Sequence, residues 1–223
     1  MSKIRGNSNH FLTDPQGFNH VELQEYLNCC LDPLTRLSDY GHGEFTTPPL
    51  EKAAPYRAAA ILVPLLRLKF EWHILMTKRA AHLAHHAGQV SFPGGKVEPF
   101  DVSPVEAALR EALEEVQLSP NLVQVVGLLD EVFSPAGFVV QPVVGIVRGE
   151  NAVDHLAPDP EEVDLMFTLP LTHLIDPDNF RLVNRKTNGK RNDYWVVEHD
   201  KHYIWGLSAR VLNDLRRRFN KVV

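Results

Sequence analysis

Apolar residues recur with two different spacings in the first half of the chain. Residues 21–31 (VELQEYLNCCL) carry them at helical spacing, with Leu23, Leu27, Cys30 and Leu31 on one side. Residues 56–68 (YRAAAILVPLLRL) are nearly all apolar, which is typical of a strand buried on both faces, and residues 71–79 (EWHILMTKR) predict its partner strand. Residues 39–55, rich in Gly, Pro and Thr, predict a preceding loop.

The second half alternates helical patterns with short apolar segments. Ser103–Gln117 predicts a helix, residues 161–175 predict a strand that passes into a short helix, and residues 208–219 predict a final helix with a solvated basic end. The inward side of that last helix carries Ala209, Leu212, Leu215 and Phe219. Further strands are predicted at residues 125–133, 139–148, 193–199 and 202–206. Strands outnumber helices, and the helices are interspersed. The pattern therefore predicts an α/β fold in which helices pack on a mixed β-sheet.

Composition limits the classes of function. The 223 residues suit one domain with extensions, and 44% apolar and 23% charged residues are ordinary for a globular protein. A net charge of −5 argues against general nucleic-acid binding, which needs a basic face. A small anionic substrate remains compatible with this charge, because a local basic pocket is enough to bind it.

The two cysteines, Cys29 and Cys30, are adjacent, so we expect neither a disulfide framework nor a zinc site. This cysteine usage fits a reducing, cytoplasmic location. The first residues carry no apolar run that would suggest a signal peptide, and the longest apolar run (AAAILVPLL) is too short to cross a bilayer. We therefore expect no membrane partner.

The helix predicted at Ser103–Gln117 carries an unusual group of charges. Placed at 100° per residue, its apolar side holds Val105, Leu109, Ala112, Leu113 and Val116. Glu111, Glu114 and Glu115 fall on the opposite side, and Arg110 lies one turn from Glu114 and can pair with it. At its start, Ser103 is the expected N-cap, Pro104 the first helical residue and Glu106 the partner in a capping box.

The spacing of the glutamates leaves two interpretations open. Like charges one turn apart destabilise a helix by a few tenths of a kcal/mol. One interpretation is a solvated acidic face, and the other is a site for a divalent metal ion such as Mg²⁺, which prefers carboxylate oxygens and substrate phosphates. The preceding residues 92–95 (FPGG) predict a turn whose glycines let backbone N–H groups approach an anion. A glycine turn that leads into a helix with clustered carboxylates favours the metal and diphosphate interpretation.

Residues 94–118 resemble the Nudix box of the Nudix hydrolases. Gly95 matches the leading glycine of the box, and its REUxEE core is matched by Arg110, Glu111, Glu114 and Glu115. Four positions depart from the pattern. Asp101 replaces the first glutamate, one extra residue precedes Arg110, Ala112 replaces the bulky aliphatic, and Gln117 replaces the late glycine.

Residues 74–95 resemble the extra signature of the coenzyme A pyrophosphatase branch of that family. The matching positions are Thr77, Arg79, Leu83, His86, Gly88, Val90, Phe92, Pro93, Gly94 and Gly95. The element IWGLSARVL near the C-terminus is similar to another element of this branch. The resemblance covers roughly residues 57–215. It implies a Nudix hydrolase domain at residues 51–223, with residues 1–50 as an N-terminal extension that holds one helix and has no assigned function.

The resemblance also implies roles for individual residues. Glu111, Glu115 and Glu114 are expected to bind Mg²⁺ or Mn²⁺, with Glu114 alternatively orienting water, and Arg110 to orient a glutamate. Gly94 and Gly95 are expected to approach the diphosphate, and Lys78 and Arg79 to meet substrate phosphates. His86 is expected either to make a structural hydrogen bond or to touch substrate. Asp101 is expected to cap or brace its loop. Glu162 is expected to be an extra metal ligand or general base, or else an ordinary exposed acid. Trp205 and Phe219 are expected in the core.

The implied fold is an α/β/α sandwich with a mixed sheet. The implied activity is hydrolysis of coenzyme A and its derivatives, small-molecule substrates, to 3′,5′-ADP and 4′-phosphopantetheine or its acyl form. One alternative is a Nudix hydrolase for another substrate, such as ADP-ribose or a dinucleoside polyphosphate. A second is a ligand-sensing Nudix domain without catalysis. Homodimers are common in the family, so a second copy of the chain is kept as a candidate partner.

Overall fold

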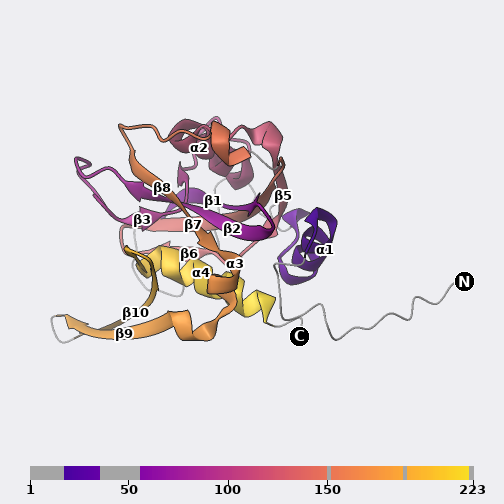
Figure 1. The fold of residues 1–223 in the computed structure, drawn as a ribbon. Helices are drawn as coiled ribbons and strands as arrows, with labels where there is room; N and C mark the ends of the chain where they lie inside the picture. Colours follow the sequence, from indigo (N-terminus) through magenta and orange to yellow (C-terminus); the bar gives the residue numbers. More distant parts are fainter. Residues whose placement is uncertain (1–17, 36–55, 150–151, 188–189, 221–223) are drawn as a thin grey trace, which may run out of the picture.

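The computed structural model describes residues 18–35, 56–149, 152–187 and 190–220 (Figure 1). The predicted loop at residues 39–55 and the predicted boundary at residue 50 lie outside these ranges. Within them, the main sheet has the strand order β3-β2-β1-β7-β5, while β4 pairs with β1, β6 with β7 and β8 with β2. The mixed sheet is confirmed, because β1 and β7 run parallel and the other pairs run antiparallel.

The elements have the following bounds. The strands of the main sheet are β1 Arg57–Leu68, β2 Glu71–Arg79, β3 Val90–Ser91, β4 Gly94–Lys96, β5 Val123–Leu128, β6 Val132–Ser134, β7 Phe138–Val147 and β8 Val163–Pro170. A second sheet holds β9 Phe180–Thr187, β10 Lys190–His199 and β11 His202–Trp205. The α-helices are α1 His20–Cys30, α2 Pro104–Val116, α3 Leu171–Ile175 and α4 Gly206–Phe219. Short 3₁₀ helices are η3 Pro120–Leu122, η4 Ala152–His155 and η5 Pro177–Asn179.

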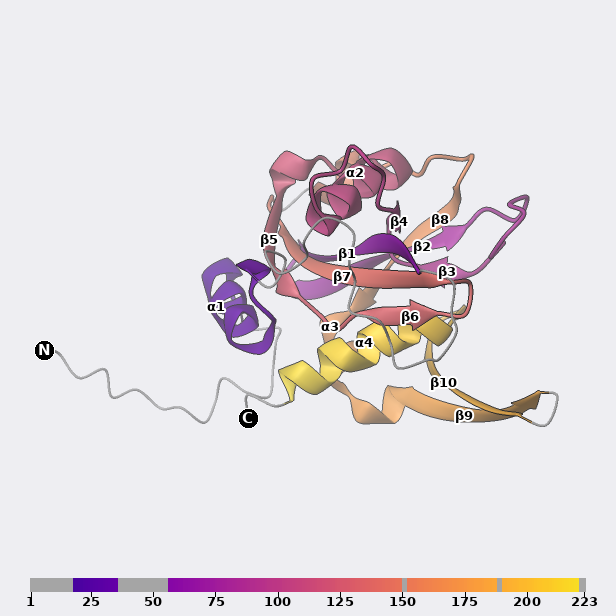
Figure 2. The same ribbon diagram turned by 180° about the vertical axis from the view of Figure 1, so that it is seen from behind.

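Helices cover both faces of the main sheet, with α2 on one side and α4 on the other (Figures 1 and 2). Alternate residues of β1 point to opposite faces, as the strand period requires. Ala60 and Leu62 pack in the cluster that contains the buried alanines of α2, whereas Ile61 and Val63 pack in the cluster that contains α4. The all-apolar segment predicted as a strand buried on both faces is therefore confirmed.

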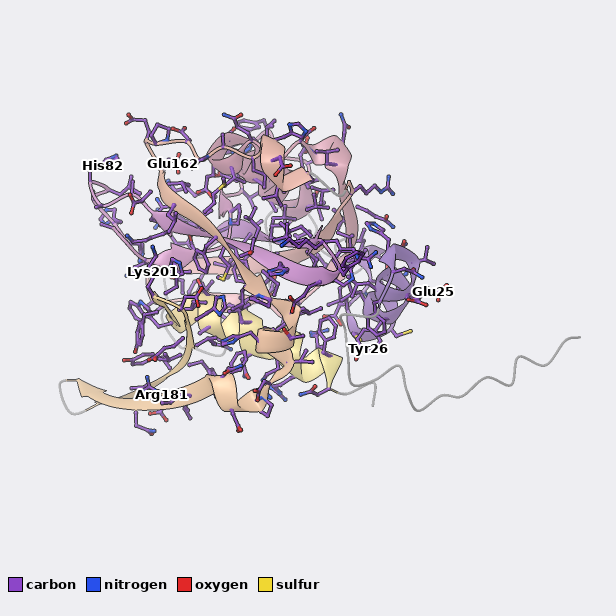
Figure 3. All side chains as sticks on the ribbon, viewed as in Figure 1. Glu25, Tyr26, His82, Glu162, Arg181 and Lys201 are labelled. Atoms are coloured by element: carbon purple, nitrogen blue, oxygen red, sulfur yellow. The ribbon has the colours of Figure 1, made fainter. Side chains whose placement is uncertain are left out.

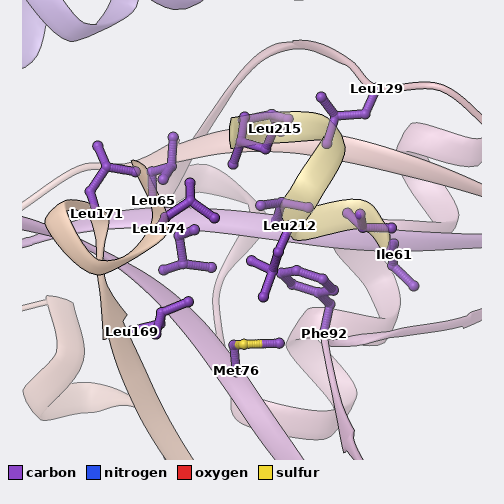
Figure 4. Close-up of a cluster of buried hydrophobic side chains, with 14 of the residues drawn as sticks. Ile61, Leu65, Met76, Phe92, Leu129, Leu169, Leu171, Leu174, Leu212 and Leu215 are labelled. Carbon is purple, nitrogen blue, oxygen red and sulfur yellow. The ribbon is translucent and has the colours of Figure 1, made fainter. Parts of the chain in front are cut away.

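The α4 side of the sheet holds the larger core. Leu212 and Leu215 of α4 lie against Ile61 and Leu65 of β1, and Leu174 of α3 joins them (Figure 4). The four inward residues predicted for the last helix are buried, including Phe219. Burial of each such leucine side chain contributes about 1.5–3 kcal/mol relative to exposure. This cluster therefore holds α3 and α4 against β1 on this face of the sheet.

Helix α1 is part of the same core. The capping box at its start is complete, since Asn19 accepts from the backbone N–H of Glu22 and Glu22 accepts from that of Asn19. Leu23 and Leu27 are fully buried, and the Tyr26 hydroxyl donates to the carbonyl of Phe219. The predicted helix in the N-terminal extension is confirmed, and it packs against the end of α4.

Several predictions about local structure were wrong. Residues 125–133 form two strands, β5 and β6, because the chain leaves its pairing with β7 around Leu129–Glu131. The strand β9 was missed, although it forms a hairpin with β10 in a second sheet beneath α4 (Figure 1). Trp205 is 40% exposed rather than in the core, and its ring lies edge-on against Tyr194.

The basic end of α4 is not simply solvated. Arg218 donates to the carboxylates of Asp32, Asp130 and Asp214 and to the carbonyl of Cys30. These partners lie on the segment after α1, on the loop between β5 and β6, and on α4 itself. Arg218 therefore joins three segments that are far apart in the sequence. None of the helices in the described ranges combines the length and the apolar character needed to span a membrane.

Candidate functional site

Helix α2 presents its charges differently from the prediction. Ser103 caps the helix by accepting from the backbone N–H of Glu106, as expected. The Glu106 carboxylate accepts from the N–H of Val102 rather than of Ser103, so the expected capping box does not close. Leu113, assigned to the apolar side, is 44% exposed, whereas Glu115 is only 2% exposed. The face of α2 that packs on the sheet thus includes a carboxylate.

Two glycines make room for this arrangement. The predicted turn at residues 92–95 is only a bend at Pro93, because Gly94 and Gly95 both belong to β4, which pairs with β1. A Cβ at Gly95 would lie 2.5–2.6 Å from the carboxylate atoms of Glu111. A Cβ at Gly94 would lie 2.4 Å from the Ala60 carbonyl oxygen, and the φ of Gly94 is +152°. Only a pair of glycines lets α2 bring its carboxylates this close to the β4 backbone.

Arg110 holds the exposed side of the site in place. Its guanidinium donates to both carboxylate oxygens of Asp101 at 3.0 Å, to Glu111 at 2.9 Å and to Glu114 at 3.0 Å. It also donates to the carbonyl of Lys96 at 3.1 Å. The predicted pairing of Arg110 with Glu114 is confirmed. Such charge-assisted, bidentate geometry is strong and directional, so Arg110 defines the positions of both glutamates.

Asp101 braces the loop that leads into α2. Its carboxylate accepts from the backbone N–H of Glu98 at 2.8 Å in addition to the two bonds from Arg110. Burial by itself would raise the pKa of Asp101, but the hydrogen bonds from Arg110 and Glu98 outweigh burial and the pKa is lowered. Asp101 is therefore an ionised anchor between the loop and the helix, as the sequence suggested.

Glu115 is the most strongly perturbed acid of the site. Burial raises the pKa of Glu115 to about 8, although the hydrogen bond from the Gly94 N–H and the charge of Arg79 both act to lower it. The N–H of Gly94 donates to one carboxylate oxygen at 3.2 Å, and Nη1 of Arg79 lies 3.5 Å from the other. The charges of Glu162 and Glu111 raise the pKa further. The negative form of Glu115 thus lacks sufficient positive charge around it.

Glu111 and Glu162 face the same region. Burial raises the pKa of Glu111 despite its contact with Arg110, and the charges of Glu114 and Glu162 add to that increase. Glu162 directly precedes β8, near the loop that carries His82 (Figure 3). Backbone bonds hold its segment, because the N–H of Asp159 donates to the Glu115 carbonyl and the N–H of Ala80 donates to that of Glu162. No sequence pattern predicted these bonds, which link segments about 40 and 80 residues apart.

Of the three other predicted substrate contacts, Arg79, Lys78 and His86, only Arg79 reaches the glutamates, as described above. The side chain of Lys78 pairs instead with Asp164 at 2.8 Å, and its charge acts on His202. Neighbouring residues of a strand point to opposite faces, so the structure does not bring Lys78 to the glutamates. His86 has a positive φ of 58° and its ring contacts the Gln89 side chain at 3.0 Å, which is the structural alternative predicted for it.

The donor set fits a hard divalent cation. Glu111 and Glu115 are carboxylates that burial disfavours in the charged form, and a cation would offset that cost. Glu114 is the exception. Its side chain is 56% exposed and turned to Arg110, and among the described residues no three His, Cys, Asp or Glu side chains converge as a ready metal site. Glu111 and Glu115 are therefore the residues that could hold an ion, with Glu162 facing them.

A mixed sheet covered by helices, with desolvated carboxylates beside a glycine pair, defines an α/β protein with a site suited to a cation. The model of the NUDIX domain matches residues 55–191, which is more than half of the chain. The chain belongs to the Nudix family.

Two relatives agree with this family. A protein named "Uncharacterized Nudix hydrolase NudL" from Enterobacter sp. (strain 638) is 38% identical over 159 residues, which cover 71% of this chain and 81% of the relative. A relative of the same name from Salmonella dublin is 38% identical over 164 residues, or 74% and 83% of the two chains. A MutT/nudix family protein from Enterococcus faecalis has a TM-score of 0.45 and 16% identity, covering 92% of this chain and 74% of its own.

Proposed function

We propose that this chain hydrolyses the diphosphate bond of coenzyme A and its derivatives, releasing 3′,5′-ADP and 4′-phosphopantetheine or its acyl form. The observation that carries hydrolysis is a pair of carboxylates, the buried Glu115 and the partly buried Glu111, against the backbone of Gly94 and Gly95. The substrate class rests on the resemblance of residues 74–95 to the coenzyme A pyrophosphatase branch.

The residues divide into holding, orienting and proton-accepting groups. Glu111 and Glu115 would hold Mg²⁺ or Mn²⁺, which would supply positive charge against the diphosphate and make water more acidic. Arg110 keeps Glu111 in position through its bonds to Asp101 and Lys96. Arg79 is the basic side chain of this site that is suited to a phosphate oxygen.

Glu162 is the better candidate for the proton acceptor, and Glu114 the weaker one. The Glu114 carboxylate already accepts a hydrogen bond from Arg110 at 3.0 Å, which orients it toward that guanidinium. The charge of Glu162 acts on both Glu111 and Glu115, and no hydrogen bond to its carboxylate is found among the described residues. It can therefore accept a proton from water.

The test of this function is incubation of the protein with coenzyme A and Mg²⁺ or Mn²⁺, followed by chromatography of the nucleotides. The wild type should release 3′,5′-ADP, and Glu115→Gln should not. Glu106→Gln, which changes an exposed acid of the same helix, is the matched control and should keep activity. Lack of cleavage by folded protein with either metal would refute the coenzyme A assignment. ADP-ribose and dinucleoside polyphosphates would then be screened, and binding without turnover would indicate a sensor.

The proton acceptor is tested separately. Glu162→Gln should lower kcat by roughly 10²-fold or more, as expected for loss of a general base, with little change in metal affinity. The adjacent exposed acid provides the control variant Glu161→Gln. If Glu114→Gln lowers kcat far more than Glu162→Gln, the assignment of the base to Glu162 is wrong. A cytoplasmic location and a homodimer remain predictions.

A further inference from the structure

The side chain of Arg79 is held much less firmly than its backbone. Its backbone N–H donates to the Gln89 carbonyl at 2.9 Å, and its own carbonyl accepts from the N–H of Gly88 at 3.1 Å. These bonds fix the end of β2. Within the described residues, the guanidinium makes one ion pair, to Glu115 at 3.5 Å, and no side-chain hydrogen bond. Four or five of its N–H groups are thus available to another acceptor.

Arg110, in the same site, has a side chain held in place by many hydrogen bonds. Its guanidinium makes five hydrogen bonds of 2.9–3.1 Å, two of them to one carboxylate. The contact of Arg79 with Glu115 is longer and single, and the Arg79 side chain is 25% exposed. The two arginines therefore differ in kind. Arg110 is part of the framework, whereas Arg79 can leave its partner without breaking a hydrogen bond.

Glu115 needs a cation, and Arg79 is the one beside it. Its carboxylate is buried, with the Gly94 N–H on one oxygen and Arg79 on the other. A divalent ion on the oxygen that faces Arg79 would repel the guanidinium at close range in a partly desolvated site. Arg79 would then turn away from Glu115 while its backbone stays fixed. Its planar fork of donors matches the geometry of a phosphate group.

We propose that Arg79 is an exchangeable cation: it pairs with Glu115 when no metal is bound, and it transfers to the substrate diphosphate when a divalent ion takes its place. This inference rests on the proposed function for its second half only. It makes Arg79 a link between the two binding events. Because such coupling is reciprocal, substrate that captures Arg79 also favours metal at Glu115.

The first experiment measures metal binding without substrate. Free Mn²⁺ is determined by electron paramagnetic resonance during titration of the full chain and of its variants. Arg79→Gln removes the competitor, so it should bind Mn²⁺ about 3–10-fold more tightly than the wild type. Arg79→Lys keeps the charge and should bind close to the wild type. The matched control is Lys78→Gln, since that neighbouring side chain pairs with Asp164 and should leave Mn²⁺ affinity unchanged.

The second experiment measures substrate binding through KM at saturating Mn²⁺. Arg79→Gln should raise KM for coenzyme A at least about tenfold, and Lys78→Gln should change it less than about twofold, as expected for loss of one fork contact to phosphate. Thermal melting verifies that each variant is folded. Unchanged or weaker Mn²⁺ binding in Arg79→Gln would show a bracing role and overturn the exchange. Tighter Mn²⁺ with unchanged KM would overturn the transfer to diphosphate.

The two proposals fail in distinguishable ways. If the wild type does not cleave coenzyme A, the proposed substrate is wrong, and the KM comparison moves to whichever nucleoside diphosphate compound is cleaved. The Mn²⁺ titration does not depend on that result, because it contains no substrate. It therefore decides whether Arg79 and a divalent ion compete for Glu115 in either case.

Discussion

Replacement of Glu115 by glutamine should stabilise the protein when no metal is present. Burial raises the pKa of Glu115 to about 8 from an ordinary value of 4.5. The folded chain therefore holds this proton more tightly than the unfolded chain does. Between these two pH values the unfolded chain is ionised and the folded one is protonated, so the free energy of unfolding falls as pH rises. Glutamine carries no charge, can still accept from the Gly94 N–H and removes this loss.

The expected gain follows from the pKa shift. One pKa unit corresponds to about 1.4 kcal/mol, and at pH 7 about 2.5 of the roughly 3.5 units between 4.5 and about 8 have been crossed. The upper limit for the gain in Glu115→Gln is therefore about 3 kcal/mol at pH 7. A domain of this size gains roughly 2–4 °C in Tm per kcal/mol, so the largest increase expected is about 6–12 °C.

The assay is thermal unfolding of both proteins in EDTA from pH 5 to pH 9. The difference in Tm should be small at pH 5, grow up to about pH 8 and then stay constant. Addition of Mg²⁺ or Mn²⁺ should raise the Tm of the wild type by mass action and that of Glu115→Gln much less. A variant that is less stable than the wild type at pH 8 in EDTA would refute the reasoning. The site would then stabilise the fold rather than cost stability.

Four further substitutions separate fold from site. In Gly95→Ala the new methyl group would push against the Glu111 carboxylate at the end of a side chain. Activity should therefore fall at least about tenfold, while the Tm stays within a few degrees of wild type. In Gly94→Ala the methyl group would meet the backbone of β1, so this variant should unfold at a clearly lower temperature. Asp101→Asn should weaken the anchor of Arg110 and cost about 1–3 kcal/mol in urea unfolding as well as activity; a stable and fully active variant would contradict this role. Arg218→Met removes one ion pair from each of three carboxylates and should cost about 1–2 kcal/mol in the same assay at unchanged kcat. Equal stability would show that the cluster is only a surface network.

The local pattern of the sequence was sufficient for most single elements. The apolar runs predicted β1 and β2, helical spacing predicted α1, α2 and α4, and the segment at residues 161–175 predicted β8 and α3. These predictions succeed because side-chain periodicity reports which face of an element is buried. The motif in α2 also located the charged residues and the family without any structure.

Tertiary structure alone decided how those charges are used. A helical wheel gives the angle of Glu115 but not what lies opposite it, and here the opposite surface is two glycines of β4. The same limit applies to Arg218, which seemed solvated until Asp32 and Asp130 were brought to it from distant segments. Periodicity describes one element at a time. The burial of a charge and its partners depend on which elements meet, and that is set by packing across the whole chain.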